Sequence, residues 1–260
     1  MNENELMLTI EQTNAMLARK GLDSEFFRQI GVEQINIPGV KGYVTPINSE
    51  HANHVGLSNL DEKDADDVIK RVIDFFSGQK KSFSWIVGPT SKPKDLQERL
   101  VKHNFVFNDE ISEYGMALST AGNMDYQDDG FHIREITLDE LGEKLDLITE
   151  SFGTGMNQES AGMLVQMAKL INSTGYYKDQ VKAYVAVEKN SGKETGFCMM
   201  EMDRKNGFAI LDGSAVLPEY RGRGIYKRMV AKRKNDAEKD GIEQLIVHAL
   251  KKHQHQCVRR

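Results

Sequence analysis

Two glycines in the second half of the chain lie where the backbone could hold an anion. Gly222 and Gly224 follow an apolar run that ends at Pro218, and they precede a segment with helical character. Glycine adopts dihedral angles closed to other residues and lets a ligand approach the backbone. The first N–H groups of a helix have no partner inside it, and the helix dipole favours an anion there. This order of residues predicts a diphosphate site.

Basic side chains surround the two glycines and add to the attraction of an anion. A tight turn with a solvated basic face is the alternative interpretation, because G-x-G alone is short and frequent. The order of strand, proline, G-x-G and helix favours the binding site. We expect the site to be formed by Arg221, Gly222, Arg223, Gly224, Ile225, Tyr226 and Lys227.

The segments around this loop are expected to form a sheet that positions it. Thr137 and Glu140 form a capping box for one helix, and Gly241 ends another that starts at the loop. A third helix is expected at 160–171. Strands are expected at 132–136, 181–187, 195–202, 208–216 and 243–249. A meander followed by a strand–loop–helix–strand crossover predicts an α+β fold with a mixed, mostly antiparallel sheet flanked by helices.

The first half of the chain contains the clearest amphipathic helix, at about 65–76, with Asp61 as its cap and Gly78 at its end. The small, acidic segment 119–130 is typical of a linker. We therefore expect one domain at 1–124 and a second at 125–260. The other elements expected in the first half are helices at 7–20 and after Ser91, and strands at 40–46, 54–57, 84–87, 105–107 and 113–118.

The stretch Ala215-Val216-Leu217-Pro218-Glu219-Tyr220-Arg221-Gly222-Arg223-Gly224-Ile225 resembles the signature of the Gcn5-related N-acetyltransferases, the GNAT family. That signature is Arg or Gln, two residues, Gly, one residue, then Gly or Ala. Tyr226 stands at the last position, so its side chain is expected to point away from a cofactor. The segments 84–89 and 95–100 resemble the partner half of two-domain members. Because this half lacks a glycine-rich loop, we expect a degenerate copy that binds no cofactor.

The resemblance implies acetyl-CoA as co-substrate, held where two parallel strands diverge. The pantetheine arm would pair with the backbone of Ser214, Ala215 and Val216, and the pyrophosphate would rest on the N–H groups from Gly222 to Lys227. An amine of a small molecule or a peptide would attack the thioester directly. The implied fold is that of acyl-CoA N-acyltransferases, with two related halves.

The base that deprotonates the amine has several candidates. Alternation places Ile210, Asp212 and Ser214 on one face of their strand, and Asp212 is the charged residue nearest the expected thioester. His248 lies on the strand across the divergence, and a histidine can act as a base near neutral pH. Each candidate can also be purely structural. The catalytic candidates are Asp212, His248 and Glu201, with Glu219 as a further alternative.

Family members usually continue past this last strand with a helix that carries a Tyr acid, and then with two more strands. No Tyr follows Tyr226 here. Either the acid is dispensed with, or the chain is truncated, or the other half or a second subunit completes the sheet. An incomplete sheet would expose an edge, which invites pairing. We expect this half to pack on the first half or to form a homodimer. The alternative is that this half is a catalytically silent module, either an acetyl-CoA-binding module or a regulatory one.

Composition excludes several classes of partner. A net charge of −5 over 260 residues gives no basic field for nucleic acid. Cys198 and Cys257 form no C-x-x-C pair, and the terminal His253 and His255 are expected in a solvated tail, so no metal is expected. Neither a signal peptide nor a membrane-spanning run is evident, so a cytoplasmic location without membrane contact is expected.

Overall fold

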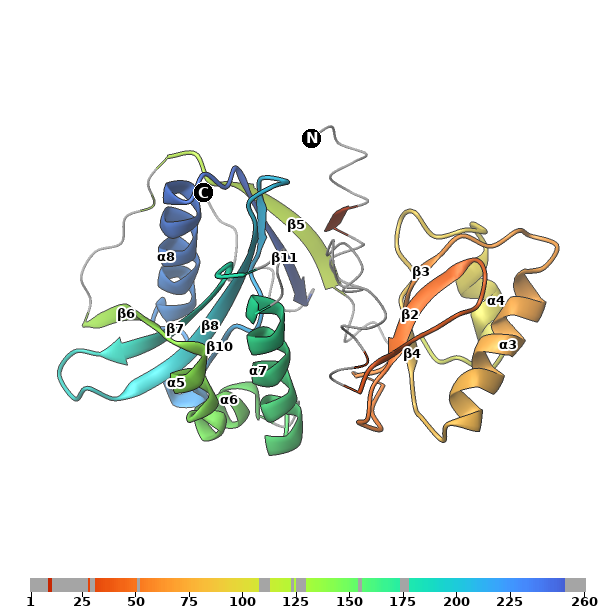
Figure 1. Cartoon of the computed structure of the whole chain (residues 1–260), viewed down its shortest axis with the longest axis horizontal. Helices are drawn as coiled ribbons and strands as arrows, with labels where there is room; N and C mark the ends of the chain where they lie inside the picture. Colours follow the sequence, from red (N-terminus) through yellow and green to blue (C-terminus); the bar gives the residue numbers. More distant parts are fainter. Residues whose placement is uncertain are drawn as a thin grey trace. The chain divides into compact units, whose positions relative to one another are not determined.

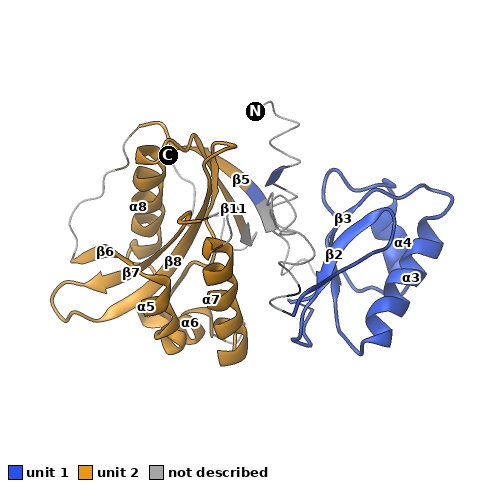
Figure 2. Cartoon of the chain, in the orientation of Figure 1, with its two compact units in different colours: residues 1–115 blue, residues 116–260 orange. Residues whose placement is uncertain are grey.

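The chain forms two compact units in the computed structural model, residues 1–115 and 116–260 (Figure 2). The structure describes residues 9–10, 28, 31–50, 52–107, 113–122, 124, 130–153, 156–173 and 178–250. The helix expected at 7–20 and the tail with His253, His255 and Cys257 lie mainly or wholly outside these residues. A domain boundary at 124/125 stays a prediction, and the compact units divide earlier in the chain.

The first unit is a small sheet with two helices packed on it (Figure 1). Its strands lie in the order β1 (Glu33–Gln34), β2 (Val40–Val44), β3 (His54–Ser58) and β4 (Ser84–Trp85). Neighbours are antiparallel except β3 and β4, which are parallel. Helix α3 (Ala65–Gly78) connects β3 to β4, and α4 (Leu96–Lys102) follows. The amphipathic pattern of α3 is confirmed, because Ala65, Ile69, Val72 and Phe76 are buried.

Three expected details of the first unit are wrong. The N-cap of α3 is Asp64 and not Asp61, which forms the preceding turn by accepting the Asp64 N–H. Residues 105–107 form no strand, and Phe107 is exposed. The strand expected at 84–87 is only two residues long.

The second unit is a larger mixed sheet, which confirms the predicted fold class. Its strands lie in the order β5 (Glu113–Ser119), β11 (Gln244–Leu250), β9 (Phe208–Ile210), β8 (Glu194–Asp203), β7 (Val181–Glu188) and β6 (Phe131–Ile136). The short β10 (Ala215–Val216) also pairs with β8. The β9–β11 pair is parallel, whereas β6–β7, β7–β8, β8–β9 and β8–β10 are antiparallel.

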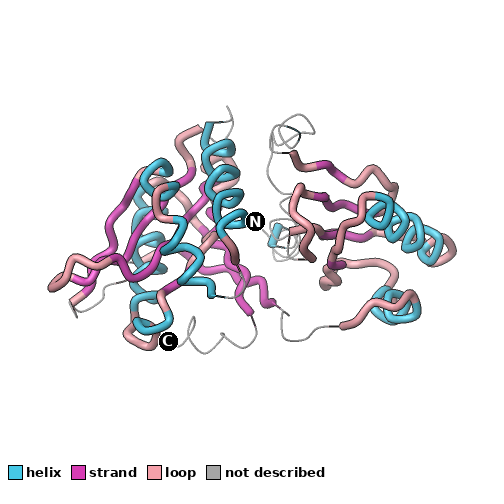
Figure 3. The backbone as a smooth tube through the Cα atoms, turned by 90° about the horizontal axis from the view of Figure 1, so that it is seen from below, coloured by secondary structure: helices cyan, strands magenta, loops and turns pink. Residues whose placement is uncertain are grey.

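Helices cover both faces of this sheet (Figures 1 and 3). Cys198, Met200 and Met202 of β8 share a buried cluster with α8 (Ile225–Lys239). Phe197, on the other face of β8, makes a ring contact with Phe152. The helices on that face are α5 (Leu138–Gly142), α6 (Leu145–Phe152) and α7 (Gln158–Ser173). The capping box of Thr137 and Glu140 is confirmed at the start of α5.

The strand at the edge beside β11 comes from a segment expected in the first half. β5 is the neighbour of β11, so the edge expected to be exposed is covered. Thr120, just after β5, donates its N–H to Glu243 O at 3.0 Å and its hydroxyl to Ile242 O at 2.6 Å. The buried Lys234 of α8 donates to Thr120 O at 2.6 Å. The sequence pattern identified the strand but not its partner, because alternation carries no information about which sheet a strand joins.

Candidate functional site

Two parallel strands diverge at the centre of the larger sheet. β9 and β11 pair as far as Ile210 and Ile246, and Leu211 N then donates to Ile246 O at 2.8 Å. Beyond this point β11 continues towards Leu250 without β9, while the chain after β9 stays beside β8 as β10. We call the region between β10 and the end of β11, residues 214–216 and 247–250, the wedge. The divergence expected from the sequence is therefore present.

A β-bulge produces the divergence. Glu201 is opposite Ile210 and Phe197 is opposite Ala215, so residues 198–200 of β8 face residues 211–214. The segment between β9 and β10 thus has one residue more than the part of β8 that it faces, and such an extra residue bends and twists a strand locally. The bulge also breaks the expected alternation, which was wrong for Ser214. Ile210 shares the face of Glu201, whereas Ser214 bonds to Arg233 of α8 on the opposite face.

The loop that follows β10 has the geometry expected of an anion site. After the short helix η3 (Pro218–Tyr220), Gly222 has φ +80° and Gly224 has φ +77°, in the left-handed region. A Cβ added at either glycine would meet nothing within 4 Å. Gly224 is the N-cap of α8, without a side-chain cap, and no acidic residue lies in the first turn. Backbone N–H groups and the positive end of the dipole therefore lie beside open space.

The two arginines of the loop contact the protein. Arg221 donates from Nε to Val216 O at 3.1 Å and from Nη2 to Ser151 O at 2.8 Å. It therefore braces the loop against β10 and α6. Arg223 lies 4.8 Å from the ring centre of Tyr220 and 3.6 Å from Glu188. The acceptor Ser151 has no sequence signal, because it is distant in the chain. Phosphate contacts by Arg221 and Arg223 stay predictions.

The remaining loop residues divide between core and surface. Ile225 is buried, and the half-buried Tyr226 packs against the same core cluster. Lys227 is exposed at the first turn of α8. Ala215 and Val216 are buried in β10. Their backbones, with that of Ser214, line one side of the wedge, where the family resemblance implied a pantetheine arm.

The three catalytic candidates occupy adjacent rows of the sheet. Ile246, Ile210 and Glu201 form one row across β11, β9 and β8. His248 comes two residues after Ile246 on β11, and Asp212 comes two residues after Ile210, so both lie at the start of the wedge. Glu201 is buried, His248 is half-buried, and Asp212 Oδ1 accepts the Gly213 N–H at 2.8 Å. The sheet therefore brings the three residues into one region, and which of them is the base stays a prediction.

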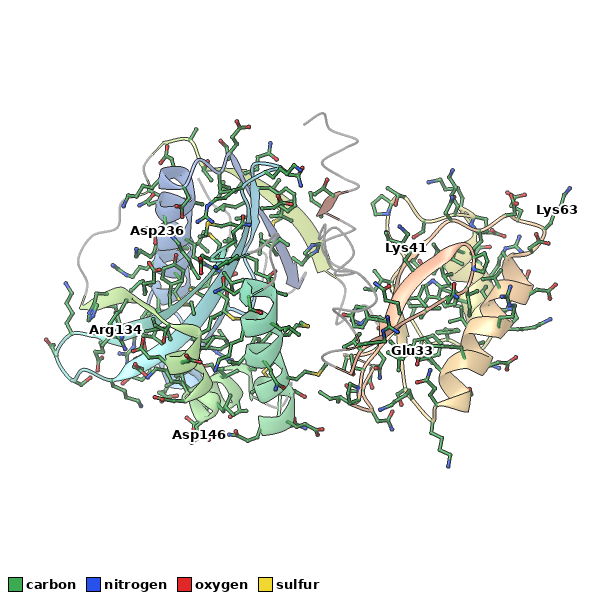
Figure 4. The ribbon with its side chains drawn as sticks, in the orientation of Figure 1. Glu33, Lys41, Lys63, Arg134, Asp146 and Asp236 are labelled. Atoms are coloured by element: carbon green, nitrogen blue, oxygen red, sulfur yellow. The ribbon has the colours of Figure 1, made fainter. Side chains whose placement is uncertain are left out.

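Two other titratable groups are less suited to proton transfer. The Glu219 carboxylate lies 3.2 Å from Lys193, and a hydrogen bond from its own backbone, together with Lys193, lowers the pKa of Glu219. Tyr184 is buried and donates at 3.0 Å to Asp236, which is labelled on α8 in Figure 4. Burial, with the charge of Asp236, raises the pKa of Tyr184. The contacts of Tyr184 are structural, and Glu219 as a base stays a prediction.

The equivalent crossover in the first unit lacks both features of the site. The first turn of α3 carries Asp66 and Asp67, whose charges oppose an anion. The chain segments that follow β3 and β4 are also joined to each other by backbone hydrogen bonds. Lys92 N donates to Ser58 O at 3.0 Å, and Leu60 N donates to Lys92 O at 3.2 Å. The region that corresponds to the wedge is therefore closed.

Comparisons with known proteins agree with this arrangement. Residues 157–259 match the profile described as "Acetyltransferase (GNAT) family". A GCN5-related N-acetyltransferase from Kribbella flavida has a TM-score of 0.61 at 11% identity, with 93% of this chain and 86% of that chain covered. One from Sphaerobacter thermophilus has a TM-score of 0.58 at 14% identity, with 80% and 67% covered.

A tandem GNAT protein from the clavulanic acid biosynthesis pathway has a TM-score of 0.57 at 11% identity, with 96% of this chain and 88% of that chain covered. No curated protein matches the sequence. In the described residues, no helix is both long and apolar enough to cross a membrane. The same residues contain no group of three or more His, Cys, Asp or Glu side chains placed to hold a metal ion.

Proposed function

Because the chain belongs to the GNAT family and has two GNAT-like halves, we propose that its second unit is an acetyl-CoA-dependent N-acetyltransferase. The observation that carries the proposal is the combination of the open helix start at Gly222 and Gly224 with the diverging strands. The first supplies N–H groups for a pyrophosphate, and the second supplies strand backbone that β10 and β11 do not share with each other, beside which an extended arm can lie. The acceptor is proposed to be a primary amine of a small molecule or a peptide.

The chain's own residues supply binding and proton removal. Acetyl-CoA would supply the acetyl group: the amine nitrogen bonds to the acetyl carbon, the C–S bond breaks with its electron pair on sulfur, and the amine proton passes to a base. Asp212, His248 or Glu201 is proposed as that base. The first unit, with its acidic helix start and closed strands, is proposed to bind no cofactor.

A silent module that binds acetyl-CoA is the second candidate, and the tyrosines favour it. Family members use a Tyr as general acid, but Tyr184 is bonded to Asp236 and Tyr226 packs against the core. Tyr220 lies within 5.0 Å of two cations, Lys193 and Arg223. Each of these three described tyrosines therefore already has a structural contact.

Thiol release separates the two functions. The protein is mixed with acetyl-CoA and a panel of small and peptide amines, and free CoA is followed with a thiol reagent. Amine-dependent release supports the enzyme. Binding of acetyl-CoA without release across the panel supports the silent module, and failure of excess acetyl-CoA to raise the melting temperature contradicts both.

A homodimer was expected because the edge of the sheet beside β11 was expected to be exposed. Since β5 covers that edge, the exposed edge no longer supports a homodimer. Gel filtration with light scattering tests the oligomeric state directly. A cytoplasmic location stays a prediction.

A further inference from the structure

A completely buried arginine lies beneath the β-bulge of the second unit. Arg233 of α8 has no exposed surface. It donates from Nε to Met229 O at 3.1 Å, and from Nη1 to Met199 O and to Ser214 Oγ, each at 2.8 Å. Its Nη2 is buried and has no hydrogen-bond partner among the described residues.

The partners of Arg233 are the groups that the bulge displaces. Met199 lies in the part of β8 that faces the bulge, and its N–H bonds to Asp212 O at 3.1 Å. Its carbonyl bonds to the guanidinium. Ser214 is the last residue of the bulge, and its hydroxyl accepts from the same Nη1. One side chain therefore bonds both to β8 and to the residue before β10, at the point where the chain diverges from β11.

This arrangement is costly for stability alone. A buried charge is usually paired with an opposite charge, and no ion pair joins Arg233 to a carboxylate within the described part of the chain. An arginine supplies a planar set of donors and a positive charge that favours negative charge nearby. A buried polar atom without a partner needs a physical explanation, and a functional role is one such explanation.

We propose that Arg233 is a positioning residue for the acetyl end of acetyl-CoA. It holds the bulge in the form that separates β10 from β11, and it orients Ser214 at the inner end of the wedge. This inference rests on the proposed function, because the acetyl end is placed by analogy with an arm that runs along β10 from the Gly222–Gly224 loop. Arg233 acts through Ser214 and the backbone of residues 211–216.

Variants of the full chain separate this role from general stability. Arg233→Met removes the charge and the donors, Arg233→Lys keeps one cationic donor group, and Ser214→Ala removes only the hydroxyl. Lys239→Met is the matched control, because Lys239 lies on the same helix with a 78% exposed side chain. The measurements are kcat for acetyl transfer, the Kd for CoA without an acetyl group, and backbone hydrogen exchange over residues 208–217.

Arg233→Met is expected to lower kcat about 100-fold by misplacing the acetyl end. The Kd for CoA should stay at its wild-type value, because the loop at Gly222 and Gly224 is intact. Exchange over 208–217 should accelerate. Arg233→Lys should restore part of kcat, and Ser214→Ala should lower it about tenfold, the effect of one hydrogen bond.

Wild-type kcat and wild-type exchange in Arg233→Met would overturn the proposal, and so would equal factors of change in kcat and in the Kd for CoA. If Arg233→Met does not fold, Arg233→Lys and Ser214→Ala decide by the same criteria. A wild-type protein that does not bind acetyl-CoA refutes the proposed function instead, and the exchange measurement then still decides whether Arg233 holds the bulge.

Discussion

Replacement of Gly224 by Asp should weaken acetyl-CoA binding about 100-fold or more while leaving the fold intact. Gly224 is the N-cap of α8 with φ +77°, and a Cβ there meets nothing within 4 Å. The backbone strain of a left-handed Asp is about 1 kcal/mol. A carboxylate at a helix N-terminus offsets part of that strain by capping and by its interaction with the dipole. The free energy of unfolding should therefore change little.

The binding penalty is much larger than this strain. At a separation of about 5 Å and an effective dielectric constant of about 20, a carboxylate repels one phosphate charge by about 3 kcal/mol. That energy weakens binding about 100-fold, since 1.4 kcal/mol corresponds to a factor of ten. The loss of a group that approaches the glycine backbone adds to this factor.

Calorimetric titration of acetyl-CoA into wild type, Gly224→Asp and Gly224→Asn measures the effect. Asn has nearly the same shape and tolerates the left-handed region, so the ratio of the Asp and Asn dissociation constants isolates the charge. Gly207→Asp is a strain control, because Gly207 has φ +74° in open space in the turn after β8. Equal affinities of the Asp and Asn variants would refute the pyrophosphate placement.

Three further predictions concern the support of the site and the fold. Arg221→Met removes two charge-assisted hydrogen bonds, to Val216 O and Ser151 O. Because the loop then loosens, acetyl-CoA binding should weaken about tenfold or more. An unchanged affinity in calorimetry would show that binding does not depend on these two bonds. Asp236→Asn weakens the buried bond from Tyr184 and should lower the free energy of unfolding by about 1–3 kcal/mol in urea titrations, and a stability equal to wild type contradicts this. Asp66 accepts from His103 at 2.9 Å, and this bond, followed by those from Arg99, lowers the pKa of Asp66 below its ordinary 3.8. The contribution of Asp66 to stability is therefore present above pH 3.8 and is lost as the pH falls through the pKa of Asp66 in the folded protein. Asp66→Asn should therefore have a lower free energy of unfolding than wild type near neutral pH, and the difference should shrink in acid.

Patterns within one segment were predictable from the sequence. Gly222 and Gly224 adopt the left-handed conformations that their spacing suggested, and Thr137 with Glu140 forms the capping box. These features depend on residues within a few positions of each other. Fold class followed because the meander and the crossover permit few topologies.

Features that depend on distant parts of the chain were missed. The bulge at residues 211–214 reversed the face of Ser214; Gly213 within it, with φ +45°, is the local signal of a bulge that the alternation pattern overlooked. β5 joined the second sheet through contacts with residues more than a hundred positions away. The bonds from Arg221 to Ser151 and from Arg233 to Met199 are tertiary for the same reason.

The stoichiometry of acetyl-CoA binding to the full chain tests the central claim most directly. Isothermal titration should give one site per chain, because the second unit has the open helix start and the wedge, whereas α3 of the first unit begins with Asp66 and Asp67 beside closed strands. A site count of two would contradict the account of the first unit. No binding at high excess of acetyl-CoA would contradict the account of the second unit, and with it the proposed acetyltransferase.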